Sequence, residues 1–239
     1  MTVAYFRETK HQAQLRILPA LRAIYEKVDR AGQVKVRQTG TGTLICFRGR
    51  IVLLTAKHCL YGHRGDENPG DKLIMTKHGI MELGSLAEPT VVSRESDDLA
   101  AFYVDEAVSE GSLDVACLQG TVRNLRRVTI AGFLARDFKV DARSEALLPK
   151  PRIYTNVSRD AGAGHIGIRY ARKQFRDTDT GAQERQPIPS GLSGGPMLDT
   201  DRLVAGAVNI VGVFTDFSSE RSLGYGESSE KALSLLSQL

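Results

Sequence analysis

Cysteine is scarce in this sequence, and its scarcity excludes several classes of protein. The 239 residues include only three cysteines, Cys46, Cys59 and Cys117. An odd and low number of cysteines cannot form a complete disulfide framework, and none stands in the CxxC or HxxxH spacing of a zinc site. A chain of this length can bury a core that is stable without such crosslinks. We therefore expect neither a disulfide scaffold nor a metal site.

Long hydrophobic runs are also absent. The longest apolar stretch, residues 203–214, contains Asn209 and falls short of the roughly 18 residues that suggest a membrane-spanning helix. At the N-terminus, charged and polar residues interrupt the segment MTVAYFRETKHQAQ before an apolar run of signal-peptide length is reached. We therefore expect a cytoplasmic protein that does not contact membranes.

A large excess of one charge sign is missing as well. The chain carries 32 basic and 28 acidic residues, a net charge of +4, and its 41% hydrophobic residues are typical of a globular protein. Basic residues gather at 123–127 and at 169–176, but no aromatic-interleaved nucleic-acid motif accompanies them. We expect a solvated, slightly positive surface and no nucleic-acid partner.

Helical periodicity is present only near the two ends of the chain. Residues 11–30 carry apolar side chains at steps of three and four, with Pro19 at the start of the helix or at a kink. Such a stripe packs on the domain behind it or binds a regulatory protein partner. Near the C-terminus, Ser228 or Ser229 can cap a helix over residues 230–239.

Short runs rich in Val, Ile, Leu, Thr and Phe occupy the sequence between these helices and are typical of β-strands. The first set comprises residues 43–47, 50–55, 72–75, 90–92, 99–104 and 113–118. The second set comprises residues 127–133, 151–156, 165–170, 196–198 and 202–214. Two successive sets of about six short strands predict an all-β fold with paired antiparallel barrels between two helices.

Three short segments carry residues suited to catalysis. The segment 189–197, PSGLSGGPM, places three glycines around Ser193, and such a turn can point its backbone amides at one spot, as an oxyanion hole requires. The segment LLTAKHC ends an apolar strand at His58, and SDDLAAF opens another strand at Asp98. Each segment alone has a plain explanation as a turn or a strand end.

Together, the GxSGGP turn, the TAxHC strand end and the DxA strand start resemble the trypsin-like (chymotrypsin-fold) serine protease family, in its non-secreted, bacterial-type branch. The resemblance includes residues 42–45 and covers roughly residues 36–239. It implies two six-stranded antiparallel, chymotrypsin-like β-barrels with an N-terminal helical extension and a C-terminal helix. The extension would span residues 1–35, the first barrel 36–125, and the second barrel with the C-terminal helix 126–239.

The same resemblance implies a role for each site residue. Ser193 would be the nucleophile, His58 the general base and then acid, and Asp98 the group that orients the imidazole, while the N–H groups of Gly191 and Ser193 would form the oxyanion hole. The chain would then be a serine endopeptidase that acts on protein or peptide substrates through an acyl-enzyme, without a cofactor. The alternative is a catalytically silent member of the same fold that acts in protein binding.

Two aspartates fit the family's aspartate position. Asp98 heads DLAAF and Asp114 heads DVACL. Asp98 lies 34 residues before Gly132, which resembles the family's glycine at the end of the second barrel's first strand, whereas Asp114 lies only 18 residues before it. The shorter interval cannot hold the last strand of one barrel and the crossing to the next, so we favour Asp98. Asp97 points the opposite way along the chain and is expected at the surface.

The sequence departs from the family at three places. Leu192 precedes the serine where zymogen-type members carry an aspartate that pairs with a new N-terminal amine, so we do not expect activation by N-terminal cleavage. Gly40 stands where a half-cystine would pair with Cys59, so Cys59 is expected as a free thiol in the core. Pro187 replaces the acidic residue of the basic-specific members, which leaves Glu184, Asp216 and His165 as candidates for reading the substrate.

Overall fold

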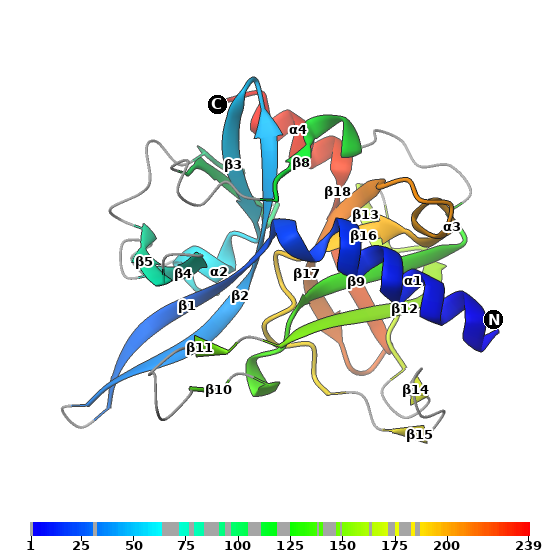
Figure 1. Ribbon diagram of the computed structural model, residues 1–239, viewed down its shortest axis with the longest axis horizontal. Coiled ribbons are helices and arrows are strands. Elements are labelled where there is room, and N and C mark those ends of the chain that lie inside the picture. Colours follow the sequence, from blue (N-terminus) through cyan, green and yellow to red (C-terminus); the bar gives the residue numbers. More distant parts are fainter. Residues whose placement is uncertain are drawn as a thin grey trace.

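The strands of this chain form two main sheets that lie side by side, with helices at their edges (Figure 1). The computed structural model describes residues 2–30, 33–63, 72–76, 79–83, 91–93, 97–104, 111–118, 125–137, 139–140, 147–148, 150–162, 164–171, 175–176, 183–184 and 187–239. Among these residues, no helix is both long and apolar enough to cross a membrane.

The first sheet is a curled sheet of eight strands. In space they follow the order β5-β4-β1-β2-β3-β7-β6, and β8 pairs in parallel with β2. Two long strands, β1 and β2, form a hairpin that projects from the body of the protein (Figure 1). The bounds are β1 (Leu21–Arg30), β2 (Gln33–Phe47), β3 (Arg50–Thr55), β4 (Lys72–Thr76), β5 (Gly79–Glu82), β6 (Val91–Val92), β7 (Ala100–Tyr103) and β8 (Leu113–Asp114).

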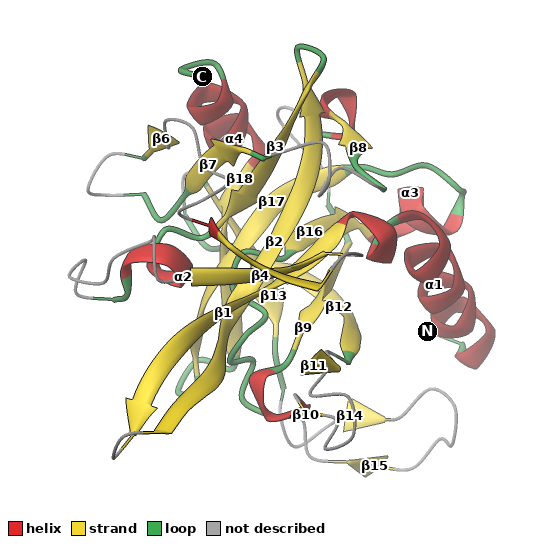
Figure 2. Ribbon diagram, turned by 60° about the vertical axis from the view of Figure 1, so that its left-hand side comes forward, coloured by secondary structure: helices red, strands yellow, loops and turns green. Residues whose placement is uncertain are grey.

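The second sheet is a closed barrel of six antiparallel strands in the order β12-β13-β18-β17-β16-β9. Its strands are β9 (Arg127–Phe133), β12 (Pro151–Arg159), β13 (His165–Arg169), β16 (Pro196–Asp199), β17 (Ile210–Ser218) and β18 (Leu223–Ser228). Two small hairpins lie near one end of this barrel, β10 (Lys139–Val140) with β11 (Leu147–Leu148) and β14 (Phe175–Arg176) with β15 (Gln183–Glu184) (Figure 2).

The predicted all-β, two-barrel architecture is confirmed. In the described residues the first barrel is an open, curled sheet of eight strands, and only the second barrel closes with six. The largest hydrophobic core is shared, because Ile45 and Leu54 of the first sheet and Phe133 and Val213 of the second belong to one buried cluster. Burial of this joint apolar surface holds the two sheets together.

The prediction of a helix over residues 11–30 is wrong for most of that range. The N-terminal helix α1 (Val3–Arg16) starts earlier, at the cap residue Thr2, and ends just before Pro19, which enters a 3₁₀ turn. From Leu21 the chain is strand β1. Side chains of β1 are buried alternately in two different cores, Ala23 and Tyr25 in one and Ile24 in the other, and this two-sided burial decides in favour of a strand.

Two other predicted strands also need correction. The range 202–214 begins with helix α3 (Thr200–Val204), capped by the Asp199 carboxylate, so its strand starts only at Ile210. The range 113–118 is a two-residue strand followed by the 3₁₀ helix Val115–Cys117. The C-terminal helix α4 (Ser229–Leu236) is present as predicted, and Ser228 is its cap.

Candidate active site

His58 and Asp98 meet because the strands that carry them are paired. β3 ends and β7 begins at the pair Thr55 and Ala100, so the residues that follow β3 and precede β7 are neighbours. His58 is the first residue of the short helix α2 (His58–Tyr61). Its Nδ1 lies 2.5 Å from Oδ2 of Asp98, and its backbone N–H donates to Oδ1 of the same carboxylate at 3.0 Å. This double contact fixes the ring and its tautomer.

The environment of His58 changes the basicity of its ring. The His58 side chain is 12% exposed. Burial lowers the pKa of the imidazole, but hydrogen bonding to Asp98 and to Cys59 outweighs burial and raises the pKa from 6.5 to about 10. The Asp98 carboxylate thus stabilises the imidazolium form of His58.

The other two aspartates lie elsewhere. Asp114 caps the short 3₁₀ helix after β8, where its carboxylate accepts a backbone hydrogen bond of 2.7 Å. Asp97 forms an ion pair of 2.8 Å with Lys231 of α4 and is only partly exposed. Of these three aspartates, the structure therefore brings Asp98 to His58.

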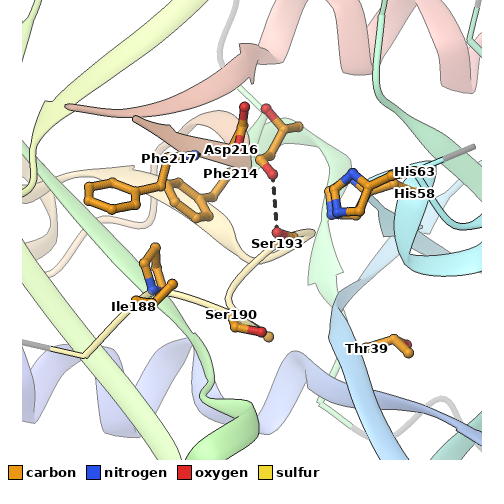
Figure 3. A pocket seen from close by; sticks show the side chains of 12 residues that line it. Thr39, His58, His63, Ile188, Ser190, Ser193, Phe214, Asp216 and Phe217 are labelled. Carbon is orange, nitrogen blue, oxygen red and sulfur yellow. Dashed lines mark hydrogen bonds between the residues drawn. The ribbon is translucent and has the colours of Figure 1, made fainter. Parts of the chain in front are cut away.

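Ser193 shares a pocket with His58. Both residues line one cavity of about 220 Å³ between the two sheets. The Ser193 hydroxyl donates a hydrogen bond of 3.1 Å to the carbonyl oxygen of Thr215, the residue that follows Phe214 on β17 (Figure 3). In this arrangement the hydroxyl is turned to the Thr215 carbonyl and not to the imidazole.

The direction of the Gly191 N–H is set by the peptide that joins Ser190 to Gly191. The carbonyl of Ser190 accepts a hydrogen bond of 2.9 Å from the N–H of Ala135. Because the C=O and N–H of a trans peptide point in opposite directions, the N–H of Gly191 faces away from Ala135. Gly191 has a φ of +91°, and a Cβ there would lie 2.7 Å from the carbonyl oxygen of Phe133, so the position requires glycine.

A second tight turn orients the N–H of Ser193 in the same way. The carbonyl of Leu192 accepts a hydrogen bond of 2.9 Å from the N–H of Gly195. Within the described part of the chain, neither the N–H of Gly191 nor that of Ser193 has an acceptor. Two unpaired donors on one glycine-rich turn form the kind of site that stabilises a developing oxyanion.

Leu192 anchors this turn through apolar contact. Its side chain is 2% exposed and belongs to the core of the second barrel, together with Ile130 and Met197. A Cβ on Gly132 would lie 3.2 Å from Cδ2 of Leu192, so these residues pack closely. The position that the resemblance assigns to an ion-pairing aspartate is occupied by a buried hydrocarbon side chain.

Gly40 and Cys59 lie against one another, as the resemblance implied. A Cβ on Gly40 would be 2.3 Å from Sγ of Cys59, and the Cys59 thiol donates to the carbonyl of Ser193 at 3.4 Å. Cys46, Cys59 and Cys117 are all free thiols. The Cys59 side chain therefore fills the space that the missing side chain of residue 40 leaves.

The walls of the pocket are partly polar and partly apolar. Ile188, Phe214 and Phe217 lie on the side of the pocket opposite His58 (Figure 3). The exposed ring of His63 stacks on the His58 ring with centroids 4.4 Å apart and planes inclined by 12°. This ring covers one face of the imidazole.

The candidate specificity residues take different places. Asp216 lines the pocket with an exposed side chain. Pro187 contacts Tyr170 through its carbonyl, and His165 lies 3.4 Å from Glu227, so neither lines the cavity. The backbone of Glu184 belongs to β15, and its side chain lies outside the described part.

Sequence reasoning missed three contributors to this site. Thr215 contributes a backbone carbonyl, which no side-chain pattern can reveal. His63 contributes a stacking ring from an exposed turn, and Thr41 contributes a buried hydroxyl from β2. His63 follows His58 by five residues, and Thr41 stands between Gly40 and Gly42. For these two residues, nearness to a motif was the only signal in the sequence.

No known protein family and no curated protein matches the sequence. Among solved structures, the chain is similar to the serine endoprotease from Yersinia pestis, with a TM-score of 0.58, 17% identity and coverage of 95% of this chain and 65% of that chain. It is similar to the Rv3671c protease from M. tuberculosis in its active form, with a TM-score of 0.54, 15% identity and coverage of 95% and 82%. The chain has the chymotrypsin-like protease fold.

The likeness to a third chymotrypsin-like structure is weaker. For the catalytically active tobacco etch virus protease with its product, the TM-score is 0.50 and the identity 11%, over 89% of this chain and 74% of that chain. The present chain spans 65% of the length of the Yersinia protein. At these identities the comparisons establish the chymotrypsin-like fold, and the activity has to be argued from the site.

Proposed function

We propose that this chain is a serine endopeptidase that hydrolyses peptide bonds through an acyl-enzyme on Ser193. The observation that carries the proposal is that three kinds of group line one cavity of about 220 Å³. They are the Ser193 hydroxyl, the His58 imidazole hydrogen-bonded to a carboxylate, and two backbone N–H groups without an acceptor in the described residues. The protease fold of the structural neighbours supports a protein or peptide as the substrate.

In the acylation half of the reaction, the Ser193 oxygen attacks the carbonyl carbon of the scissile bond. The neutral ring of His58 accepts the hydroxyl proton at Nε2, and Asp98 stabilises the imidazolium that forms. The carbonyl oxygen becomes negatively charged and accepts hydrogen bonds from the N–H groups of Gly191 and Ser193. When the C–N bond breaks, His58 returns its proton to the leaving amine.

In the deacylation half, water takes the place of the amine. His58 removes a proton from the water, the resulting oxygen attacks the ester carbonyl, and the proton then goes to Oγ of Ser193 as the ester bond breaks. The products are a carboxylic acid, an amine and the original enzyme, so no cofactor is needed.

The resting geometry requires one adjustment before the attack. The Ser193 hydroxyl donates to the Thr215 carbonyl, and rotation about the Cα–Cβ bond must release it toward His58. Side-chain rotation of this kind is fast compared with catalysis. The raised pKa of His58 also favours the imidazolium in the resting enzyme, so the reaction proceeds from the fraction that has lost this proton.

A fluorophosphonate probe tests the proposal directly, because it reacts with activated serines. We expect a covalent adduct on Ser193 in the wild-type protein and none in Ser193→Ala, and cleavage of an unstructured protein such as casein should follow the same pattern. His58→Ala should also lose both reactions while remaining folded by circular dichroism. Asp114→Asn is the matched control, because Asp114 lies outside the pocket.

Two outcomes would contradict the proposal, and each concerns a different part of it. Absence of an adduct on folded wild-type protein would favour the catalytically silent binding module. Casein cleavage that persists in His58→Ala would contradict the role of the imidazole.

A further inference from the structure

The buried hydroxyl of Thr41 lies between the two sheets and is hydrogen-bonded to the turn that contains Gly191 and Ser193. Thr41 is on β2 and is fully buried. Its Oγ1 donates a hydrogen bond of 2.7 Å to the carbonyl oxygen of Gly191 and accepts one of 3.0 Å from the N–H of Phe133 on β9. A single hydroxyl thus satisfies two backbone groups of the second barrel from within the first sheet.

The backbone of Thr41 is equally well fixed. Its N–H donates to the carbonyl of Ser193 at 2.7 Å, and its own carbonyl accepts a hydrogen bond of 2.8 Å from the hydroxyl of Thr55. Gly194 packs closely on this side, because a Cβ there would lie 1.9 Å from the Thr41 carbonyl oxygen. The Thr41 hydroxyl is therefore a rigid donor and acceptor.

This rigidity matters because Gly191 is intrinsically mobile. A glycine can rotate about both of its backbone bonds with little steric cost. The peptide before Gly191 is held by the hydrogen bond from Ala135 to Ser190. The peptide after it is held at its carbonyl by Thr41 and at its N–H, which belongs to Leu192, by the carbonyl of Pro189. Without the Thr41 hydroxyl, the carbonyl of Gly191 would be buried without its partner, which favours a shift of this peptide.

We propose that Thr41 is a positioning residue that holds the carbonyl side of Gly191 and so, together with the hydrogen bond from Ala135 to Ser190, keeps the Gly191 N–H pointed into the oxyanion hole. The inference rests on the proposed serine endopeptidase function. Thr41 does not touch the substrate; it acts by holding the backbone of Gly191. It also makes the geometry of the hole depend on the contact between the sheets, because the hydroxyl comes from β2 and the turn belongs to the second barrel.

Two substitutions at position 41 separate the hydroxyl from the shape of the side chain. Thr41→Val keeps the branched shape and removes the hydroxyl, whereas Thr41→Ser keeps the hydroxyl and removes a methyl group. Thr43→Val is the matched control on the same strand. Thr43 is also buried, but its hydroxyl has no hydrogen-bond partner within the described residues.

The measurements are the inactivation rate and the affinity for a fluorophosphonate, and kcat and KM for a peptide cut by the wild-type enzyme. Removing one oxyanion donor costs about 100- to 1000-fold in turnover. A donor that is misdirected but still present should cost less, so we expect Thr41→Val to lower kcat and the inactivation rate about 10- to 100-fold. KM, the fluorophosphonate affinity and the pH dependence set by His58 should remain unchanged. Thr41→Ser should recover most of the rate, and Thr43→Val should match the wild type.

Three results would overturn the proposal: a rate for Thr41→Val within about twofold of the wild type, a loss confined to KM, or a failure of Thr41→Ser to recover the rate. Thr41→Ala provides a second hydroxyl-free protein with a smaller side chain if Thr41→Val does not fold, and the same losses are expected. An unreactive wild-type protein would instead contradict the endopeptidase function, so the two failures are distinguishable.

Discussion

The carboxylate of Asp98 accepts two hydrogen bonds from His58, one from the backbone N–H to Oδ1 and one from Nδ1 to Oδ2. A single aspartate thus fixes both the position of the histidine backbone and the orientation of its ring. Asp114, whose sequence context is similar, caps a short helix instead.

This difference predicts opposite effects of two similar substitutions. Asp98→Asn should lower turnover by roughly 10⁴-fold, because an amide does not stabilise the imidazolium and favours the wrong tautomer. Asp114→Asn should leave turnover within about twofold, since an asparagine can still cap the 3₁₀ helix. Steady-state kinetics of the two purified variants provides the measurement. If Asp114→Asn had the larger effect, the orienting role would pass to Asp114.

The pH dependence of activity should reflect the raised pKa of His58. A general base acts only when it is unprotonated, so kcat/KM should increase as the pH rises through the pKa of the free enzyme's imidazole. Burial lowers this pKa, but interactions with Asp98 and Cys59 outweigh burial and raise it from 6.5 to about 10, so the rising part of the profile should lie on the alkaline side of 6.5.

The residual activity of Asp98→Asn provides the control for this profile. Removing the negative charge of Asp98 should move the rising part of the kcat/KM profile toward lower pH. A wild-type profile that rises below 6.5 would contradict the stabilisation of the imidazolium.

The contact between Gly40 and Cys59 predicts a stability effect that a second substitution partly reverses. Gly40→Ala would place a Cβ 2.3 Å from Sγ of Cys59 and 3.1 Å from the Ser193 carbonyl, and overpacking of this kind costs about 1–3 kcal/mol. In the double variant with Cys59→Ala, the contact with Sγ is removed. The loss of unfolding free energy in the double variant should therefore be smaller than the sum of the losses in the two single variants. Urea unfolding of the four proteins gives the coupling energy. Additive effects would show that the two side chains do not compete for the same space.

The buried position of Leu192 predicts how much the turn depends on apolar packing. Leu192→Ala should lower the free energy of unfolding by about 2–5 kcal/mol, and Leu192→Met by less than about 1.5 kcal/mol, because methionine conserves most of the volume. Thermal and urea unfolding measure both. Equal losses for the two variants would mean that shape, and not buried volume, determines the stability of the turn.

The sequence predicts the fold best where local pattern and tertiary environment agree. β3 and β9 have the predicted bounds, because each is a short run rich in apolar and β-branched residues that is buried along most of its length. Spacing along the chain favours Asp98, because the length of a barrel strand and a crossing is a physical constraint that can be counted. Asp98 lies next to His58, and its catalytic role stays a prediction.

Prediction failed where tertiary contacts override a local pattern. In β1, apolar residues stand at helical steps, and the strand is favoured only by tertiary contacts: pairing with β2 and β4 and burial on both faces. β18 has two glycines, which argue against a strand, but a Cβ on Gly226 would lie 2.2 Å from Sδ of Met197. The hydrogen bond between Ser193 and Thr215 joins residues on different elements and leaves no trace in either local sequence.

The burial of Leu192 also links the turn around Ser193 to the folding of the second barrel. The Leu192 side chain is a hydrocarbon and carries no charge. The stabilisation that it gives the turn should therefore change little with salt concentration or with cleavage that creates a new N-terminal amine. The turn has the same packing partners as the strands of the second barrel, and its geometry should be complete as soon as that barrel has folded. Loss of the turn on heating should therefore coincide with melting of the barrel and should not precede it.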